Sequence, residues 1–404
     1  MVQNTTRYVA LDVLRGITIA AMLVVNNPGT RSAVFAPLRH SKWADCTPTD
    51  LVFPFFLFIV GVSMVFSFAK MQEQDYPKRV KKILRRGVLI FLTGLLLNAF
   101  PFFPTNPNPE LSGWDNWLNY LRSVRILGVL QRIALCYILG GLLALWLSRP
   151  KKIICAMLVL CTAHLLILVF TGDSSAPYAD GARGVFSLQG QGSGAIDIAL
   201  FGENHVYHGY GQPFDPEGLL GTLSGCCTLL LGFLCGGLIR RGKEPLMVIS
   251  RLYAISIGCL LAGLAIGIWY PICKPLWTGS YVLYAGGWAI MTLALAIYLI
   301  DIRNKSRLLM PFRALGMNPL LCFVLAGITV KVLRMIKWSA AVSMPDGSII
   351  QKHWNALGWF HDNVCVQIIG KSCEISSLMY SLCFMGVFLI LAVILYRKKI
   401  IIKF

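Results

Sequence analysis

The chain has 404 residues, of which 56% are hydrophobic and only 14% are charged. Soluble domains carry about 25% charged residues, and the mean hydropathy of +0.66 departs from them in the same direction. Leu51–Ala69 runs for 19 residues without a charge, which is close to the ~20 apolar residues that a helix needs to cross a bilayer. A soluble enzyme and a disordered chain are therefore excluded. The predicted fold class is an all-α polytopic membrane protein.

The apolar runs and the residues that interrupt them predict about ten transmembrane helices. In chain order the expected spans are 10–26, 49–69, 85–103, 122–147, 152–171, 217–239, 250–271, 280–300, 312–335 and 375–396. We see no internal repeat, so residues 1–404 are treated as a single transmembrane domain. Asp12 and Arg15 interrupt the first apolar stretch, and we therefore expect no cleavable signal peptide.

The Lys and Arg residues alternate sharply between successive connections. One set of connections, 70–86, 149–152, 240–251, 303–313 and 397–403, holds 23 of these residues when Arg7 is included. The other set holds eight and comprises 27–48, 104–121, 172–216, 272–279 and 336–374. The positive-inside rule places the first set and both termini in the cytoplasm. Membrane orientation thus explains the net charge of +19 without nucleic acid as a partner, and the long loops should face outward.

Ionisable residues inside a bilayer are costly and often functional. Asp12 and Arg15 are three residues apart, so they share a helix face and can pair, either to orient the helix or to act in a site. Asp50 opens the second span, where its charge suits the N-terminal end of the helix dipole. A capping role alone would explain Asp50, and a role in the chemistry remains open.

Three cations follow one another in the fourth predicted span. Arg122, Arg125 and Arg132 are spaced to share one helix face, and Gln131 is adjacent to the last of them. Arg122 is close enough to the boundary to extend its guanidinium to the interface. Arg132 is too deep for that explanation, so it is a candidate for contact with a phosphate or a cofactor.

The first outside loop holds the residues with the clearest chemistry. Asn26-Asn27-Pro28-Gly29 ends a helix, and His40 follows before Asp50 starts the next one. A histidine titrates near neutrality and can take a proton from an attacking amine or hydroxyl. An asparagine amide can donate to the oxyanion that forms. The alternative is a solvated surface histidine.

A second group of polar residues precedes the sixth span. A metal site or contacts to glycan hydroxyls would both suit its members, Asp197, Glu203, Asn204, His205 and His208. His164 lies in mid-span and is predicted to be a buried interior histidine. Most of the 13 cysteines lie in apolar runs and no CxxC pair occurs, so they act as small hydrophobic residues. A disulfide stays open among the cysteines in or near loops, namely Cys46, Cys273, Cys365 and Cys373.

Several motifs together resemble the transmembrane catalytic region of the heparan-α-glucosaminide N-acetyltransferase family. In the first third of the chain these are 11–16, Asn26, 40–43 and 50–56. Further motifs follow at 128–132, 214–222, 276–281, 316–318 and 395–399. They cover essentially the whole chain in order.

The resemblance implies an acetyl-CoA-dependent N-acetyltransferase of bacterial type. In that family acetyl-CoA binds from the cytosol, and the acetyl group reaches an amino sugar across the membrane. His40 matches the family's essential histidine, and Asn26 matches a neighbouring catalytic asparagine. The implied location is the bacterial inner membrane as a multi-pass protein, with active loops facing the periplasm, and the family suggests a homodimer.

We therefore expect a membrane acyltransferase in which His40 is the base or the acetyl carrier, Asn26 stabilises the oxyanion and Asp50 orients or charge-tunes the site. The cofactor contacts are expected from Arg15, Gln131 and Arg132. The contacts to the acceptor are expected from Asp215, Glu217, Trp277 and Asn318. No metal is expected in the site. A transporter of an amino sugar or glycan fragment is the alternative, because buried charges and broken helices suit both functions.

Overall fold

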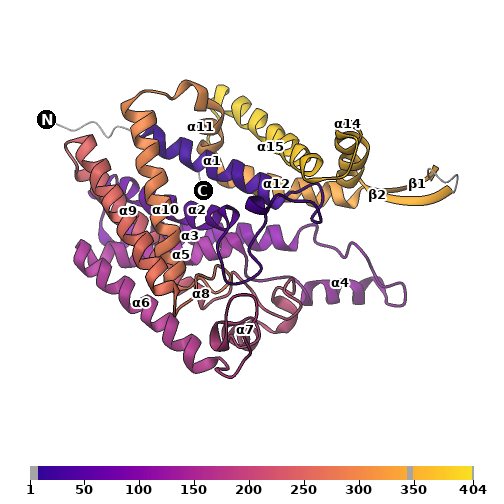
Figure 1. The fold of residues 1–404 in the computed structure, drawn as a ribbon, viewed down its shortest axis with the longest axis horizontal. Coiled ribbons are helices and arrows are strands. Elements are labelled where there is room, and N and C mark those ends of the chain that lie inside the picture. Colours follow the sequence, from indigo (N-terminus) through magenta and orange to yellow (C-terminus); the bar gives the residue numbers. More distant parts are fainter. Residues whose placement is uncertain (1–7, 344–348, 403–404) are drawn as a thin grey trace.

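The structure of the chain, a computed structural model, describes residues 8–343 and 349–402, so Arg7 and Lys403 of the charge count lie outside it. Its elements are mostly helices (Figure 1). They are α1 Val9–Asn26, α2 Val52–Ala69, α3 Tyr76–Ala99, α4 Gly113–Arg122, α5 Val129–Leu147, α6 Pro150–Thr171, α7 Ser193–Phe201, α8 Gly221–Arg241, α9 Pro245–Gly267, α10 Gly279–Ala296, α11 Met310–Met317, α12 Pro319–Met335, β1 Lys337–Ser343, β2 Ile349–Asn355, α13 Ala356–Phe360, α14 Val366–Ile369 and α15 Glu374–Arg397.

The prediction of an all-α polytopic membrane protein is confirmed. Among the described residues, eight helices are long and apolar enough to cross a membrane, or nine if the bent pair α11–α12 forms one span. The third predicted span, 85–103, is occupied by α3, which begins earlier and is not among the eight. Its first half is basic, and only residues 87–99 of it are free of charge.

α8 is the central helix of the bundle. It contacts α2, α5, α6 and α10, and 72% of its apolar window is buried, against 17% for the peripheral α6. Its glycines allow this close approach. A Cβ on Gly232 would lie 2.0 Å from the carbonyl oxygen of Phe58, and one on Gly61 of α2 would lie 1.9 Å from that of Leu229. The α2–α8 contact is thus backbone against backbone, as in small-residue packing between membrane helices.

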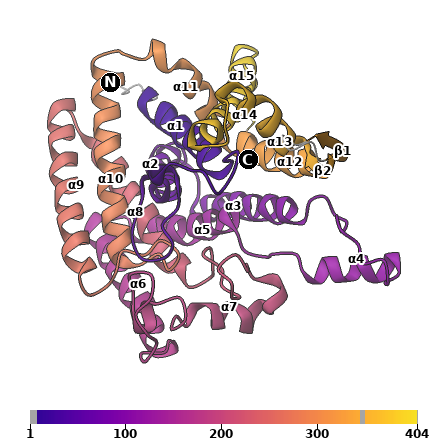
Figure 2. The ribbon, with the colours of Figure 1, turned by 45° about the vertical axis from the view of Figure 1, so that its right-hand side comes forward.

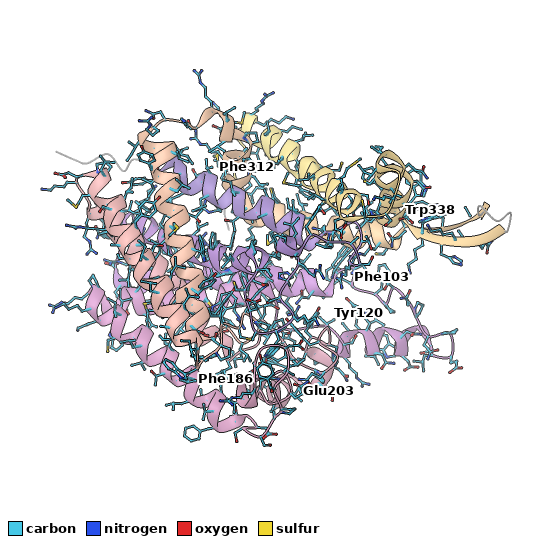
Figure 3. The ribbon with its side chains drawn as sticks, in the orientation of Figure 1. Phe103, Tyr120, Phe186, Glu203, Phe312 and Trp338 are labelled. Atoms are coloured by element: carbon cyan, nitrogen blue, oxygen red, sulfur yellow. The ribbon has the colours of Figure 1, made fainter. Side chains whose placement is uncertain are left out.

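α1 packs on α11 in the same manner. A Cβ on Gly16 would lie 1.7 Å from the carbonyl oxygen of Phe312 (Figure 3), and one on Gly316 would lie 1.8 Å from that of Asp12. The chain then bends by 75° between α11 and α12. Asn318 precedes Pro319, and a residue before proline is disfavoured in the helical region, so the helix ends there and a new one starts.

The fourth predicted span begins seven residues later than expected. Arg122 ends α4, whereas Arg125 lies in a non-helical segment before α5, so the prediction that they share a helix face with Arg132 was wrong. The side-chain amide of Asn98 donates to the carbonyl oxygens of Arg125 (2.9 Å) and Leu127 (3.2 Å). These bonds satisfy backbone acceptors that a helix would otherwise use.

The loops predicted to lie outside gather at one end of the bundle, which we call the loop end. Trp43 Nε1 donates to the carbonyl oxygen of Phe186 (2.7 Å), and Asp45 N donates to that of Ile272 (2.9 Å). α4 projects sideways from this end (Figure 2). The grouping agrees with the charge pattern, whereas the side of the membrane that the loop end faces stays a prediction.

A β-hairpin was not expected. The predicted outside loop 336–374 contains a two-stranded antiparallel hairpin in which Lys337 pairs with Asn355 and Trp338 pairs with Trp354. It extends away from the bundle in Figure 1. Three helical segments, α13, a π-turn over His361–Cys365 and α14, then return the chain to α15.

Gly61→Ala should destabilise the protein, because the new Cβ must displace the Leu229 carbonyl. Overpacking of this kind costs about 1–3 kcal/mol, so the Tm in detergent should fall by roughly 3 °C or more. The matched control is Gly258→Ala in α9, where a Cβ would meet nothing within 4 Å. It should leave the Tm unchanged or raise it, since alanine is the better helix former. Equal effects of the two substitutions would contradict the packing argument.

The predicted orientation can be tested by cysteine labelling on a background without reactive native thiols. Lys42→Cys at the loop end should react with a membrane-impermeant maleimide on cells whose outer membrane is permeable. Gln72→Cys, in the basic connection after α2, should react only after the inner membrane is opened. The reverse labelling pattern would invert the topology.

Candidate active site

The first loop returns to the bundle through two short helical turns. These turns, Ala36–Leu38 and Pro48–Leu51, flank the His40 segment, and each has a proline near its start, where a fixed φ favours a helical turn. The Thr49 hydroxyl donates to the carbonyl oxygen of Pro37 over 3.0 Å, which joins the two turns. His40 is thereby held beside the first turn of the second span.

His40 and Asp50 form a hydrogen-bonded pair. Nδ1 of His40 lies 2.6 Å from Oδ1 of Asp50, and the side chains are 46% and 1% exposed. A lone pair on Nδ1 would face an anionic oxygen at this distance, so we assign the proton to Nδ1, which donates to Asp50. Nε2 is then the basic nitrogen of the ring, and within the described residues it makes no hydrogen bond.

The Asp50 carboxylate is held by its own loop as well. Oδ2 accepts from the backbone N–H of Ser41 (3.0 Å), the N–H of Thr47 (3.1 Å) and the Thr47 hydroxyl (3.0 Å). Thr47 and Asp50 also form a capping box at the start of the second span. The capping role and the role beside His40 were alternatives in the sequence, and the structure combines them in one carboxylate.

Lys274 is the third charged group at this position. Its Nζ lies 3.2 Å from Oδ1 of Asp50 and 3.0 Å from Nδ1 of His40, and its side chain is only 18% exposed. Sequence reasoning missed Lys274, because it stands more than 220 positions from Asp50. The only available signal was a lone lysine in a short, otherwise uncharged outside connection.

Two buried aromatic residues, Tyr281 and Trp277, lie behind Asp50, and we call them the aromatic layer. The Tyr281 hydroxyl donates to the backbone carbonyl of Asp50 (2.6 Å), and its ring meets Trp277 at a centroid distance of 5.4 Å. Trp277 is 1% exposed and donates from Nε1 to Thr228 Oγ1 (3.1 Å). Trp277 therefore supports the site from within, and its contact with the acceptor stays a prediction.

Arg132 and Gln131 are buried next to this layer. The Arg132 guanidinium stacks over the Trp277 ring at 5.2 Å and donates from Nη2 to the carbonyl oxygen of Gly218 (2.7 Å). Its Nε and Nη1 atoms, and both amide atoms of Gln131, are buried without a hydrogen-bond partner in the described structure. Polar groups of this kind are rarely left unsatisfied, so they are available to a ligand or to water.

Asp215 and Glu217, two predicted acceptor contacts, are instead paired with Arg125. The guanidinium donates to both oxygens of Asp215 (2.8 and 2.6 Å) and to Oε2 of Glu217 (2.5 Å). It also stacks over Tyr207 at 4.8 Å. This clamp joins the segment before α5 to the segment before α8, so the geometry favours a structural role for both carboxylates over acceptor binding.

Asn26 is the last residue of α1, and its side chain is exposed. In the described residues its amide makes no hydrogen bond, so it is free to donate to a ligand. The neighbouring Asn27 amide is used internally, since it donates to the carbonyl oxygen of Leu23 (2.9 Å). No hydrogen bond joins Asn26 to His40 in the described part of the chain, and its catalytic role stays a prediction.

Arg15 and Asn318 lie in other surroundings. Arg15 pairs with Asp12 (3.4 Å), as predicted, and donates to Ser63 Oγ of α2 (2.6 Å). Arg15 thus joins α1 to α2, whereas Arg132 contacts the Gly218 carbonyl and the Trp277 ring. The Asn318 amide exchanges hydrogen bonds with the backbone of Ile400 and Ile402 in the C-terminal tail (2.9 and 2.8 Å), and its contact with the acceptor stays a prediction.

The polar group before α8 does not assemble into a metal site. His205 Nδ1 pairs with the carbonyl oxygen of Val124 (2.7 Å), and among the described residues no three His, Cys, Asp or Glu side chains are placed to hold a metal. His164 is buried and pairs with the Tyr270 hydroxyl (3.0 Å), so its prediction as an interior histidine is confirmed.

The cysteines near His40 are not suited to carry an acyl group. Burial, with the charge of Asp50 nearby, raises the pKa of Cys46 to about 12, and burial raises the pKa of Cys273 to about 12. Neither forms a thiolate near neutral pH, and the thiolate is the nucleophile. All thirteen cysteines are free, so no disulfide joins the loop cysteines. The imidazole of His40 is the one nucleophilic or basic group that this cluster exposes among the described residues.

Comparison with known proteins finds similarity to the same family that the motifs resemble. The family model described as heparan-alpha-glucosaminide N-acetyltransferase, catalytic, matches residues 7–177. The mouse heparan-alpha-glucosaminide N-acetyltransferase is 27% identical over 368 residues, which cover 80% of this chain and 53% of the mouse protein. The human protein of the same name is 28% identical over 367 residues, or 78% of this chain and 52% of the relative. The chain thus resembles the catalytic region and spans about half the length of the curated relatives it matches.

Asp197→Asn should alter how stability depends on pH. Burial, together with the charge of Asp215, raises the pKa of Asp197 to about 6, although the N–H of Leu219 and the charge of Arg132 oppose the shift. The folded state therefore binds the proton more tightly than the unfolded chain does, and ionised Asp197 costs stability above pH 6. The cost, up to about 3 kcal/mol, disappears as the pH falls from 6 towards 4.

The measurement is the Tm in detergent between pH 4.5 and 8. Asp197→Asn should melt above the wild type at pH 7.5, and the difference should shrink towards pH 4.5. Glu203→Gln, an exposed carboxylate just after α7, is the matched control and should change neither value. A variant that is less stable than the wild type at pH 7.5 would show that Asp197 stabilises the fold as an anion.

Proposed function

We propose that this chain is a membrane acyltransferase that moves the acetyl group of cytosolic acetyl-CoA to the amine of an amino sugar or glycan on the extracytoplasmic side. One observation carries the proposal: a histidine with a free Nε2 is paired with a buried carboxylate at the loop end. The names and extent of the matched relatives support the choice of an N-acetyl transfer.

The reaction forms an amide and breaks the thioester. The acceptor nitrogen attacks the acetyl carbonyl carbon, and His40 Nε2 takes the proton that this nitrogen loses. The carbon–sulfur bond then breaks, and the proton passes from His40 to the leaving CoA sulfur. Asp50 accepts the hydrogen bond from the N–H at Nδ1 of His40 throughout the reaction. Its charge stabilises the imidazolium while that form exists. Asn26 is the candidate donor to the oxyanion.

The second route is acetyl transfer through His40 itself. In that case Nε2 attacks the acetyl carbonyl carbon, the carbon–sulfur bond breaks and CoA leaves as its thiolate. The acceptor amine then attacks the acetyl-imidazole, the bond from Nε2 to the acetyl group breaks, and the proton that the amine loses neutralises the CoA thiolate. Both routes use the same free nitrogen and the same Asp50 contact. They differ in kinetics, because only the carrier route gives ping-pong behaviour and an acetylated His40 peptide in the absence of acceptor.

Arg132 and Gln131 suit the reactive end of the donor better than its nucleotide. Arg132 lies in the first turn of α5, which begins at the loop end, and stacks on the aromatic layer behind Asp50. The unsatisfied N–H groups of these two residues can bind amide and carbonyl oxygens. The phosphates of the donor would remain at the opposite, basic end, where charge favours them.

His40→Ala should abolish acetyl transfer while the protein stays folded. Loss of a general base costs roughly 10²–10⁴-fold in rate, and loss of an acetyl carrier removes the reaction altogether. The measurement is transfer of radiolabelled acetyl groups from acetyl-CoA to a panel of amino sugars by purified protein in detergent. Activity near that of the wild type would overturn the assignment.

Arg132→Ala is the contrasting variant. Acetyl-CoA binding, measured by calorimetry, should be weaker in Arg132→Ala, whereas His40→Ala should leave that binding nearly unchanged.

The acetyl-transfer assay also tests the transporter alternative, which the broken helix pair α11–α12 supports. A transporter would move the amino sugar across proteoliposomes and leave the thioester intact, and this result would replace the proposed function.

A further inference from the structure

Lys274 and Asp50 compete for the same side of the His40 ring. Nδ1 has a single in-plane position, and both Oδ1 of Asp50 (2.6 Å) and Nζ of Lys274 (3.0 Å) lie beside it. A proton on Nδ1 can be donated to Asp50, and then Lys274 cannot also donate to that atom. Lys274 instead donates to Oδ1 of Asp50 (3.2 Å), so one carboxylate oxygen accepts from both side chains.

The charges of the three groups decide which form of the imidazole is favoured. With a neutral imidazole, Asp50 and Lys274 cancel each other's charge. With an imidazolium, two cations share one carboxylate, and the second cation lies 3.0 Å from the ring nitrogen. Without Lys274, Asp50 alone would stabilise a lasting imidazolium, which has no lone pair left to accept a proton.

We propose that Lys274 is a positioning residue that disfavours the imidazolium form of His40, while Asp50 holds the single ring proton on Nδ1, so that Nε2 keeps its lone pair. Asp50 orients the ring, and Lys274 prevents the same carboxylate from trapping the ring in its protonated form. A proton taken by Nε2 from the acceptor is therefore short-lived and passes on to the CoA sulfur.

Lys274 is held in place by structure on both sides. Cys273 pairs with Ala44 and Asp45 in isolated β-bridges, and its N–H donates to Thr278 Oγ1 (3.1 Å). Trp277 adopts a left-handed φ of 54°, a backbone conformation that costs energy for a bulky residue. The turn Lys274–Trp277 is therefore fixed against the first loop, and the Lys274 side chain that reaches the ring is only 18% exposed.

The other charged groups around the ring do not replace Lys274. Arg39 and Lys42 flank His40 in the chain; the Arg39 guanidinium donates to the carbonyl oxygen of Val34 (3.3 Å), and Lys42 lies 4.0 Å from Asp180. Asp45 is exposed and accepts from the N–H of Cys46 (2.7 Å). In the described residues, no charged side chain except Asp50 and Lys274 lies within hydrogen-bond distance of the His40 ring.

The first test does not require enzyme activity. Diethyl pyrocarbonate acylates neutral imidazole, and the His40 peptide can be followed by mass spectrometry in detergent-solubilised protein from pH 5 to 9. The exposed His208 is the internal reference among the six histidines. Lys274→Met should move the midpoint of the His40 rate–pH curve upward by roughly one unit or more, whereas Lys274→Arg, which keeps the charge, should hold it near the wild type.

Each outcome of this test is decisive. If Lys274 only fastens the loop, Lys274→Met will change the plateau rate at high pH through altered access but leave the midpoint in place, and the proposal is overturned. An identical curve for Lys274→Met and wild type overturns it as well. Lys274→Gln, which retains a hydrogen-bond donor, replaces Lys274→Met if the methionine variant is not monodisperse, and the same upward shift is expected.

The second test rests on the proposed function. In the acetyl-transfer assay, Lys274→Met should lose at least tenfold in kcat/KM at pH 7 and recover most of it at pH 8.5, because high pH restores neutral His40. His40→Ala should not recover at any pH. If no acyl transfer is found with any variant, the proposed function fails, and the acylation curves still decide the role of Lys274.

Discussion

The buried carboxylate of Asp50 is the interaction on which the loop end depends. It accepts from five donors in three side chains and two backbone N–H groups, while Tyr281 holds its backbone carbonyl. A charge that is 1% exposed is tolerated only when it is paired and fully hydrogen-bonded. The requirement to satisfy one anion thus brings the first loop, the start of the second span, the Lys274 turn and α10 to one place.

The rest of the bundle gives this anion a rigid support. Glycine contacts between α2 and α8 and between α1 and α11 bring backbones together, which leaves little freedom for the helix that begins at Asp50. Trp277 transmits this rigidity, since it packs on Phe53 of α2 at 5.0 Å and under Arg132 of α5. The His40 ring is therefore exposed, while the groups that hold it are buried and fixed. A reactive group requires such a rigid support.

Local sequence signals were sufficient for part of this picture. The apolar runs indicated a helix at each of the ten predicted spans, and the short separation of His40 and Asp50 made their contact predictable once a loop joined them. The predicted acceptor contacts of Asp215, Glu217 and Trp277 stay predictions, but local sequence could not reveal the surroundings of these residues. Arg125 pairs with the two acids over about 90 positions of sequence, and Trp277 is buried by helices that its own segment does not reveal.

The sequence by itself determined the fold class, a helix at each predicted span, the grouping of the long loops and the histidine with its carboxylate, because hydropathy and short-range spacing act within one turn or one loop. Tertiary structure alone decided that Asp50 both caps a helix and orients His40, that Lys274 joins the pair, and that Arg132 keeps unsatisfied N–H groups beside the aromatic layer. These features depend on which helices become neighbours. Burial and close packing over the whole bundle determine which helices are neighbours. The local sequence of a single segment does not determine this.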